Sequence, residues 1–177
     1  VRAAQFLGGE PFLVPEHQKV WDMMIEEKVS TYCQITTNGT QYNDRVVRIL
    51  EALPCSITIS FDGVTPQTFE SIRVNAHFDQ VMHNFNRFQE YSRRHGRTVS
   101  FNFSLMTLNW HEFADFLLFA EEHGCPVSVC TVVSPAKFSL FMIPVDQLRP
   151  IVSHLEAIEE RIAQQLVVNR KAWTDTI

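Results

Sequence analysis

Positive charge is scarce in this sequence. Its 177 residues hold 15 Lys and Arg against 20 Asp and Glu, which gives a formal net charge of -5. A protein whose main partner is nucleic acid needs a basic surface to neutralise phosphates. Docking on an anionic membrane needs the same kind of surface. We therefore expect no nucleic-acid partner and no membrane partner.

Long apolar runs and a cysteine framework are also missing. No run approaches the roughly 20 apolar residues that a membrane-spanning helix needs, and residues 1–7 lack the apolar segment of a signal peptide. The four cysteines, at irregular spacing, are not a disulfide framework. We therefore expect a reducing, cytoplasmic location. The seven histidines form no H-x-x-H or H-E-x-x-H pattern, so we predict no metal-binding residue in this chain.

Short apolar runs alternate with longer amphipathic ones along the whole chain. This pattern predicts five strands, each followed by at least one helix. The expected strands cover residues 2–7, 32–37, 56–61, 98–106 and 127–133. The order implies a parallel sheet with right-handed crossovers in an α/β protein. Two arrangements fit it: part of a parallel (β/α) TIM-like barrel, or a doubly wound sheet.

We predict a single domain over residues 1–177, with a C-terminal helix from 146 to about 170 that has Leu148, Ile151, Leu155, Ile158 and Ile162 on one face. One helix start stands out before it. Asn109-Trp110-His111-Glu112 has the spacing of a capping box with Asn in place of Ser or Thr, which predicts a helix over about 110–123.

The first predicted strand ends in Gly8-Gly9-Glu10-Pro11. Two glycines let the backbone bend and approach a ligand closely. Pro11 disfavours a helical conformation for the residue before it. The resulting turn would expose carbonyl groups and one carboxylate, which suit an ammonium group. A plain strand-to-helix turn would use the same residues, so the tetrapeptide alone supports both readings.

Further turn motifs follow the next strands. The second strand ends in Thr36-Thr37-Asn38-Gly39-Thr40 and the third in Ser60-Phe61-Asp62-Gly63; Ile72-Arg73 and then Phe78, Val81 and Asn84 come after them. Singly, Asn-Gly and Asp-Gly are common turn residues. Together and in this order, the motifs resemble the radical S-adenosylmethionine (SAM) superfamily, most closely its branch with a C-terminal SPASM or twitch extension. The resemblance spans residues 6–133.

This resemblance implies a partial barrel of about six β/α units and a set of SAM-binding residues. Gly8, Gly9 and Glu10, with Pro11, would hold the amino group of SAM. Ser60, with Asp62 nearby, would lie near the ribose or carboxylate, and Arg73 would pair with the carboxylate, for which a planar guanidinium is well suited. Weaker candidates are Asn38, Ser104, Met106 and Val133. For Asn38 a role in building the turn is the favoured reading. The resemblance identifies no catalytic residue.

One defining feature of that family is missing here. Its C-x-x-x-C-x-x-C loop binds a [4Fe–4S] cluster and should precede Gly-Gly-Glu-Pro, but Cys33, Cys55, Cys125 and Cys130 lack that spacing. We expect a truncated core, about strands 2 to 6, that is inactive and cofactor-free by itself; a degenerate member is the other reading. The parent would use SAM and the cluster to make a 5′-deoxyadenosyl radical for hydrogen abstraction, with peptide or protein modification as the expected reaction class.

Two other functions stay open, and one assembly is expected. An aldolase or lyase type of β/α barrel would need a catalytic lysine at a strand end or a glycine-rich phosphate loop; Lys137 follows the last strand without such a loop. The second open function is that of a binding module without a cluster. Residues 2–7 would expose an unpaired strand edge, for which a homodimer is the simplest closed solution.

Overall fold

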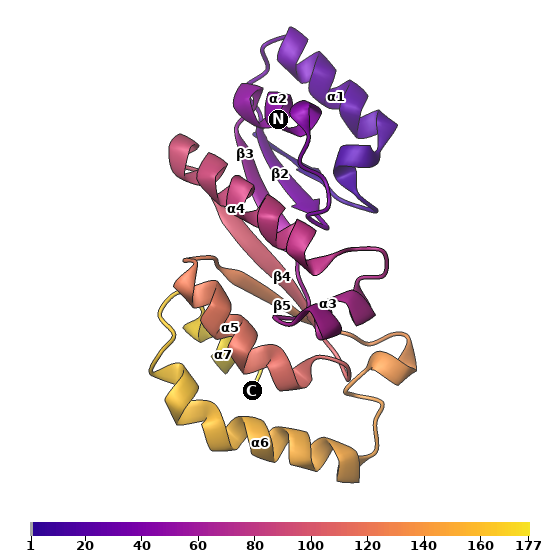
Figure 1. Ribbon diagram of the computed structural model, residues 1–177, viewed down its shortest axis with the longest axis vertical. Coiled ribbons are helices and arrows are strands. Elements are labelled where there is room, and N and C mark those ends of the chain that lie inside the picture. Colours follow the sequence, from indigo (N-terminus) through magenta and orange to yellow (C-terminus); the bar gives the residue numbers. More distant parts are fainter. Residues whose placement is uncertain (1) are drawn as a thin grey trace. The chain divides into compact units, whose positions relative to one another are not determined.

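The computed structural model describes residues 2–177 and is drawn in Figure 1. Its five strands are hydrogen-bonded in chain order, β1-β2-β3-β4-β5. A doubly wound sheet reverses its strand order at a switch point, whereas the strands of a β/α barrel follow the chain. The strand order and the helix after each strand therefore confirm the α/β partial-barrel prediction. The chain divides into two compact units; the single-domain assignment of 1–177 stays a prediction.

The first unit holds the chain up to Ser60 together with Ala76–Ser100. Its elements are β1 (Ala3–Phe6), η1 (Pro11–Leu13), α1 (Pro15–Glu26), β2 (Tyr32–Thr37), α2 (Asp44–Ala52), β3 (Cys55–Ser60), α4 (Phe78–His95) and the start of β4 (Val99–Leu105). β1 pairs parallel with β2, and β2 with β3. Because parallel strands end at the same edge of a sheet, the turns after β1 and β2 are neighbours.

The second unit holds Phe61–Asn75 and Phe101–Ile177. Its elements are α3 (Pro66–Ile72), the rest of β4, η2 (Trp110–Glu112), α5 (Phe113–Glu122), β5 (Val127–Thr131), η3 (Ala136–Phe138), α6 (Val145–Ala163) and α7 (Arg170–Thr174). β4 and β5 pair parallel, with Ser104 opposite Cys130. The order of helices and strands along the chain can be followed by colour in Figure 1.

Aromatic rings fill the core of each unit. In the first, Trp21 is fully buried and its ring centroid lies 4.8 Å from that of Phe6. In the second, Phe103 and Phe116 are fully buried with ring centroids 4.5 Å apart. Such aromatic pairs add to the free energy gained by burying their area. These cores hold the strands rigidly, so the turns at the strand ends are presented on a fixed scaffold.

The C-terminal helix is shorter than predicted. α6 ends at Ala163, and α7 begins only at Arg170, so the continuous helix expected over 146–170 is corrected to two. The cause is Glu121, whose carboxylate accepts the backbone N–H groups of Val167, Val168 and Asn169 at 2.9 Å each. Those N–H groups are then not available to a helix ladder. Ile151, Leu155 and Ile162 are buried, in agreement with the predicted apolar face.

No helix within residues 2–177 is both long enough and apolar enough to cross a membrane.

Candidate functional site

The turn after β1 has a backbone that only glycine adopts readily. Gly8 and Gly9 have φ angles of +88° and +56°, in the region that L side chains avoid. A Cβ atom added at either position would meet nothing within 4 Å. The constraint is therefore conformational, and the space beside the turn is open to a ligand.

Glu10 closes this turn with a buried carboxylate. The residue is 8% exposed. Its carboxylate accepts the Thr37 hydroxyl, whose Oγ1 lies 2.8 Å from both carboxylate oxygens, the Asn38 backbone N–H at 2.8 Å and the Phe12 N–H at 3.2 Å. These donors are neutral, and no cationic side chain in the described part of the chain forms an ion pair with Glu10. The carboxylate thus ties the end of β1 to the end of β2 while its negative charge is left for a ligand.

The turn after β2 is held by two asparagines. The Asn38 side-chain oxygen accepts the backbone N–H of Thr40 at 2.9 Å and its hydroxyl at 2.7 Å, so Asn38 builds the local turn. The Asn84 side chain, which is buried on α4, donates to the Gly39 carbonyl at 2.9 Å. Asn84 belongs to one of the sequence motifs but had been given no role; its role in the structure is to anchor this turn.

In the second unit, the predicted site residues Asp62 and Arg73 form an ion pair. Arg73 Nη2 lies 2.5 Å from Asp62 Oδ2, and the Asp62 side chain is 1% exposed. Asp62 also accepts the Ser104 N–H at 2.6 Å. Burial raises the pKa of Asp62, against the opposing effects of the Arg73 charge and the Ser104 hydrogen bond. Within the described residues, the buried Nε of Arg73 has no hydrogen-bond partner.

A cavity of about 410 Å³ gathers four of the predicted residues, Asp62, Arg73, Ser104 and Met106. Its remaining wall is mostly apolar and is formed by Ser71, Ile72, Val74, Leu108, Val132, Pro135 and Phe138. A mainly apolar wall with one ion pair is typical of small-molecule sites.

Two predicted residues lie elsewhere. Val133 is 59% exposed and does not line this cavity, whereas its neighbour Val132 does. Ser60 is the last residue of β3 and is half-buried in the first unit.

Asn109 is the first residue that the sequence analysis did not assign to the site. It is completely buried. Its side-chain N–H groups donate to the carbonyls of Asp62 and Ser104, both at 3.0 Å, and its side-chain oxygen accepts the Met106 N–H at 2.8 Å. One side chain therefore fixes the backbone of three residues that line the cavity.

Glu112 is the second residue that was not assigned to the site from the sequence, and its contacts correct the capping-box prediction. Its carboxylate accepts the N–H groups of Val64 and Thr65 at 2.7 and 3.3 Å, and the hydroxyls of Thr65 and Thr68 at 2.5 Å each. Burial acts to raise the pKa of Glu112, but these hydrogen bonds outweigh it and lower that pKa. The helix that was predicted over 110–123 starts as the short η2, and α5 begins only at Phe113.

The loop that Glu112 holds also depends on Gly63. A Cβ atom there would lie 2.9 Å from the Thr68 side chain and 3.0 Å from the Phe69 backbone nitrogen, which is closer than side chains pack. The Asn109-x-x-Glu112 spacing was the one feature of the sequence that pointed to Glu112. The hydrogen-bond partners of Glu112 could not be predicted from it, because they lie 44 to 48 positions away.

Two further observations concern metal ligands and Lys137. Among residues 2–177, no three His, Cys, Asp or Glu side chains are grouped so that they could hold a metal ion. Lys137, the residue that an aldolase-type reading requires, has its Nζ 4.7 Å from the Phe138 ring centroid and does not line the cavity.

Comparison with protein families matches residues 1–120 to the radical SAM superfamily. Among solved structures, the crystal structure of Streptococcus suis SuiB bound to S-adenosylmethionine is similar, with a TM-score of 0.60 and 18% sequence identity. The match covers 90% of this chain and 37% of SuiB, so the chain spans well under half the length of that protein. Comparison with curated proteins found no match.

Proposed function

Because the chain belongs to the radical SAM superfamily, which matches residues 1–120, we propose that it binds SAM. The observation that carries this proposal is the Gly8-Gly9-Glu10 turn, where an open backbone adjoins a carboxylate that only neutral groups hydrogen-bond. We assign this turn to the amino group of SAM. When bound, SAM supplies family enzymes, together with a reduced [4Fe–4S] cluster, with a 5′-deoxyadenosyl radical for hydrogen abstraction.

The turn fits an ammonium group. Ammonium carries three N–H donors and one positive charge. The carbonyls of the exposed turn at Gly8 and Gly9 are suitable acceptors, and Glu10 supplies a charge of opposite sign. Pro11 begins η1 and is buried, which fixes the direction in which the chain leaves the turn. In this proposal Glu10 therefore acts twice, by joining two strand ends and by attracting the ligand.

Arg73 fits a carboxylate. Its guanidinium has five N–H donors, and its ion pair with Asp62 is formed through Nη2. The buried Nε has no partner among the described residues. We propose that the unused donors of Arg73 bind the SAM carboxylate, with Asp62 as the residue that orients the guanidinium. Ser104 and Met106, in the same cavity, would contact the ligand beside it.

Residues 2–177 offer no group of ligands for the cluster, so we assign the cluster to the complete protein. For that protein we propose an enzyme of the SPASM or twitch branch that modifies a peptide or protein. The resemblance in motif order supports this proposal, and the likeness to SuiB supports the fold that it requires. We also propose a cytoplasmic location, which suits the four unbridged cysteine thiols of the described chain.

We further propose that the chain forms a homodimer through β1. β1 is the first strand in the sheet order, and among the described residues only β2 pairs with it. Its outer edge therefore offers N–H and C=O groups to another chain. Sedimentation equilibrium over a range of concentrations tests this, and a monomer mass at the highest concentration would contradict it.

The proposed SAM site is tested by calorimetric titration of the chain with SAM and with methylthioadenosine, which lacks the amino-acid part of SAM. We expect SAM to bind more tightly by about tenfold or more, because it adds charged hydrogen bonds. Glu10→Gln should remove the part of that advantage that comes from the amino group. Glu16→Gln, at an exposed position in the first turn of α1, is the matched control and should leave it unchanged. Equal affinities for the two ligands would overturn the assignment of the turn.

A further inference from the structure

The sheet formed by β1, β2 and β3 has two chemically different faces. One face is apolar and buried, with Phe6, Cys33, Ile35, Cys55, Ile57 and Ile59. The alternating positions face the other way and carry Gln5, Gln34, Thr36, Ser56 and Thr58. Parallel strands that are covered on both sides are normally apolar on both sides. The second face is therefore suited to hydrogen-bonding groups.

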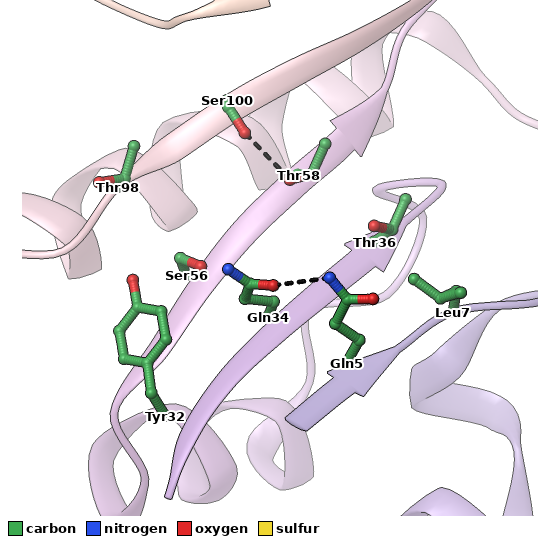
Figure 2. Close-up of a pocket in the computed structure, with 9 residues that line it drawn as sticks. All are labelled: Gln5, Leu7, Tyr32, Gln34, Thr36, Ser56, Thr58, Thr98 and Ser100. Carbon is green, nitrogen blue, oxygen red and sulfur yellow. Dashed lines mark hydrogen bonds between the residues drawn. The ribbon is translucent and has the colours of Figure 1, made fainter. Parts of the chain in front are cut away.

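A cavity of about 370 Å³ lies on this polar face, within the first unit (Figure 2). It is lined by Gln5, Leu7, Tyr32, Gln34, Thr36, Ser56, Thr58, Thr98 and Ser100. Its volume falls in the range of small-molecule sites, about 300–1,000 Å³. Leu7 is the one apolar residue of this lining, and no lining residue is charged.

Two hydrogen bonds within the lining leave other groups unused. Gln5 Nε2 donates to Gln34 Oε1 at 2.9 Å, and the hydroxyls of Thr58 and Ser100 are 3.0 Å apart. Figure 2 shows the amide nitrogen of Gln34 directed toward Ser56, and the amide oxygen of Gln5 directed toward Leu7. The paired glutamines thus offer N–H donors at one end and a carbonyl acceptor at the other.

We propose that this cavity binds an uncharged carboxamide group. An amide carries one carbonyl acceptor and N–H donors, so it can accept from the unused N–H of Gln34 at one end or donate to the unused carbonyl of Gln5 at the other. A carboxylate, phosphate or ammonium group would give up part of its hydration here without gaining an opposite charge, because the lining has none. The site therefore selects for polarity without charge.

The cavity borders the two turns described above. Leu7 directly precedes Gly8, and Thr36 directly precedes Thr37, whose hydroxyl donates to Glu10. A group bound in the cavity lies next to the turn assigned to SAM, so we assign the carboxamide to the substrate; that assignment rests on the proposed function, whereas the binding chemistry does not.

The test is a titration of the full chain, with ¹⁵N-labelled glutamine side chains, followed by NMR. The probes are acetamide, N-methylacetamide and acetate, the last being a charged group of the same shape as acetamide. We expect acetamide to shift the Gln5 and Gln34 amide signals and to bind roughly fivefold more tightly than acetate, the effect of about one hydrogen bond. Tighter binding of N-methylacetamide would indicate that the natural ligand is a backbone amide, and tighter binding of acetamide would indicate a side-chain amide. Either order of affinities supports the site.

Three variants complete the test. Gln34→Leu removes the donor end and should weaken acetamide binding by roughly fivefold. Gln34→Glu keeps the shape of the side chain but has no N–H donor, and it should weaken acetamide binding as much. Gln147→Leu, at an exposed position on α6, should change nothing. Acetate binding as tight as acetamide, or glutamine signals that do not move, would overturn the proposal.

SAM titration of the same samples separates the two claims. Lost amide binding with intact SAM binding would refute the carboxamide site alone. Intact amide binding without SAM binding would refute the proposed function alone.

Discussion

The carboxylates of Asp62 and Glu112 both bind residues of the segment 62–73 in the second unit, yet their pKa values move in opposite directions. Asp62 lies 2.5 Å from a guanidinium nitrogen, and its pKa is raised. Glu112 accepts hydrogen bonds from neutral donors, and its pKa is lowered. Almost complete burial outweighs the single cation at Asp62, whereas two N–H groups and two hydroxyls outweigh burial at Glu112. The difference teaches that the number of hydrogen bonds and the depth of burial, more than the presence of a cation, decide how a carboxylate is stabilised here.

Removing the Glu112 carboxylate should have the largest effect on stability. Glu112→Ala leaves the N–H groups of Val64 and Thr65 and two hydroxyls without their acceptor. We expect a loss of about 3 kcal/mol in the free energy of unfolding, measured in urea. Glu122→Ala, at the exposed end of α5, is the matched control and should change it by no more than about 0.5 kcal/mol. Equal losses of unfolding free energy in the two variants would show that the hydrogen bonds of Glu112 contribute nothing to stability.

Arg73→Ala should have the second-largest effect on stability. It leaves Asp62 buried without its cation, and because the Arg73 side chain is 27% exposed we discount the cost of a broken buried pair to about 2 kcal/mol. SAM affinity should also fall by about tenfold. Arg48→Ala is the control, because Arg48 forms an exposed ion pair with Asp22 and lies outside the proposed site. If both variants bind SAM equally well, Arg73 does not hold the carboxylate.

Asp62→Asn should cost less, within about 1 kcal/mol. The raised pKa means that the neutral form of this side chain is less disfavoured in the folded protein than in the unfolded chain. The amide oxygen that the substitution introduces can still accept the Ser104 N–H. Urea unfolding of Asp62→Asn beside Arg73→Ala measures the difference. A larger loss for Asp62→Asn than for Arg73→Ala would mean that the ion pair outweighs burial, which reverses the comparison.

The pH dependence of stability separates the two carboxylates most finely. The pKa of Glu112 is lowered, so its contribution is present above the ordinary value of 4.5 and is lost as pH falls through the folded value. The pKa of Asp62 is raised, so its contribution is greatest below the ordinary value of 3.8 and falls as pH rises through the folded value. Relative to wild type, Glu112→Gln should therefore be most destabilised at neutral pH, and Asp62→Asn in acid. Thermal melts between about pH 3 and 7 test this, and parallel curves would contradict it.

The fold was predictable because its signals are local. Strands such as Cys55–Ser60 alternate buried and half-buried residues, and each lies between turn residues and an amphipathic helix. The C-terminal helix failed as one element for the opposite reason. Glu121 draws residues 167–169 into another hydrogen-bond pattern from 46 to 48 positions away, and no local pattern reports such a partner.

The site was predictable only in part for the same physical reason. Motif order identified Glu10, Asp62 and Arg73 as site residues. It did not show that Asp62 and Arg73 bind each other, nor that Thr37 and Asn38 bind Glu10. Asn109 escaped notice because a buried amide that fixes backbone groups has the same sequence appearance as one that starts a helix.

The central claim is that the Gly8-Gly9-Glu10 turn receives the amino group of SAM. A crystal structure of this chain grown with SAM tests it most directly. We predict the SAM nitrogen within hydrogen-bond distance of a Gly8 or Gly9 carbonyl and on the side of the turn where Glu10 lies, with Glu10 still bonded to Thr37 and Asn38. A bound SAM whose amino group contacts none of these residues would contradict the account.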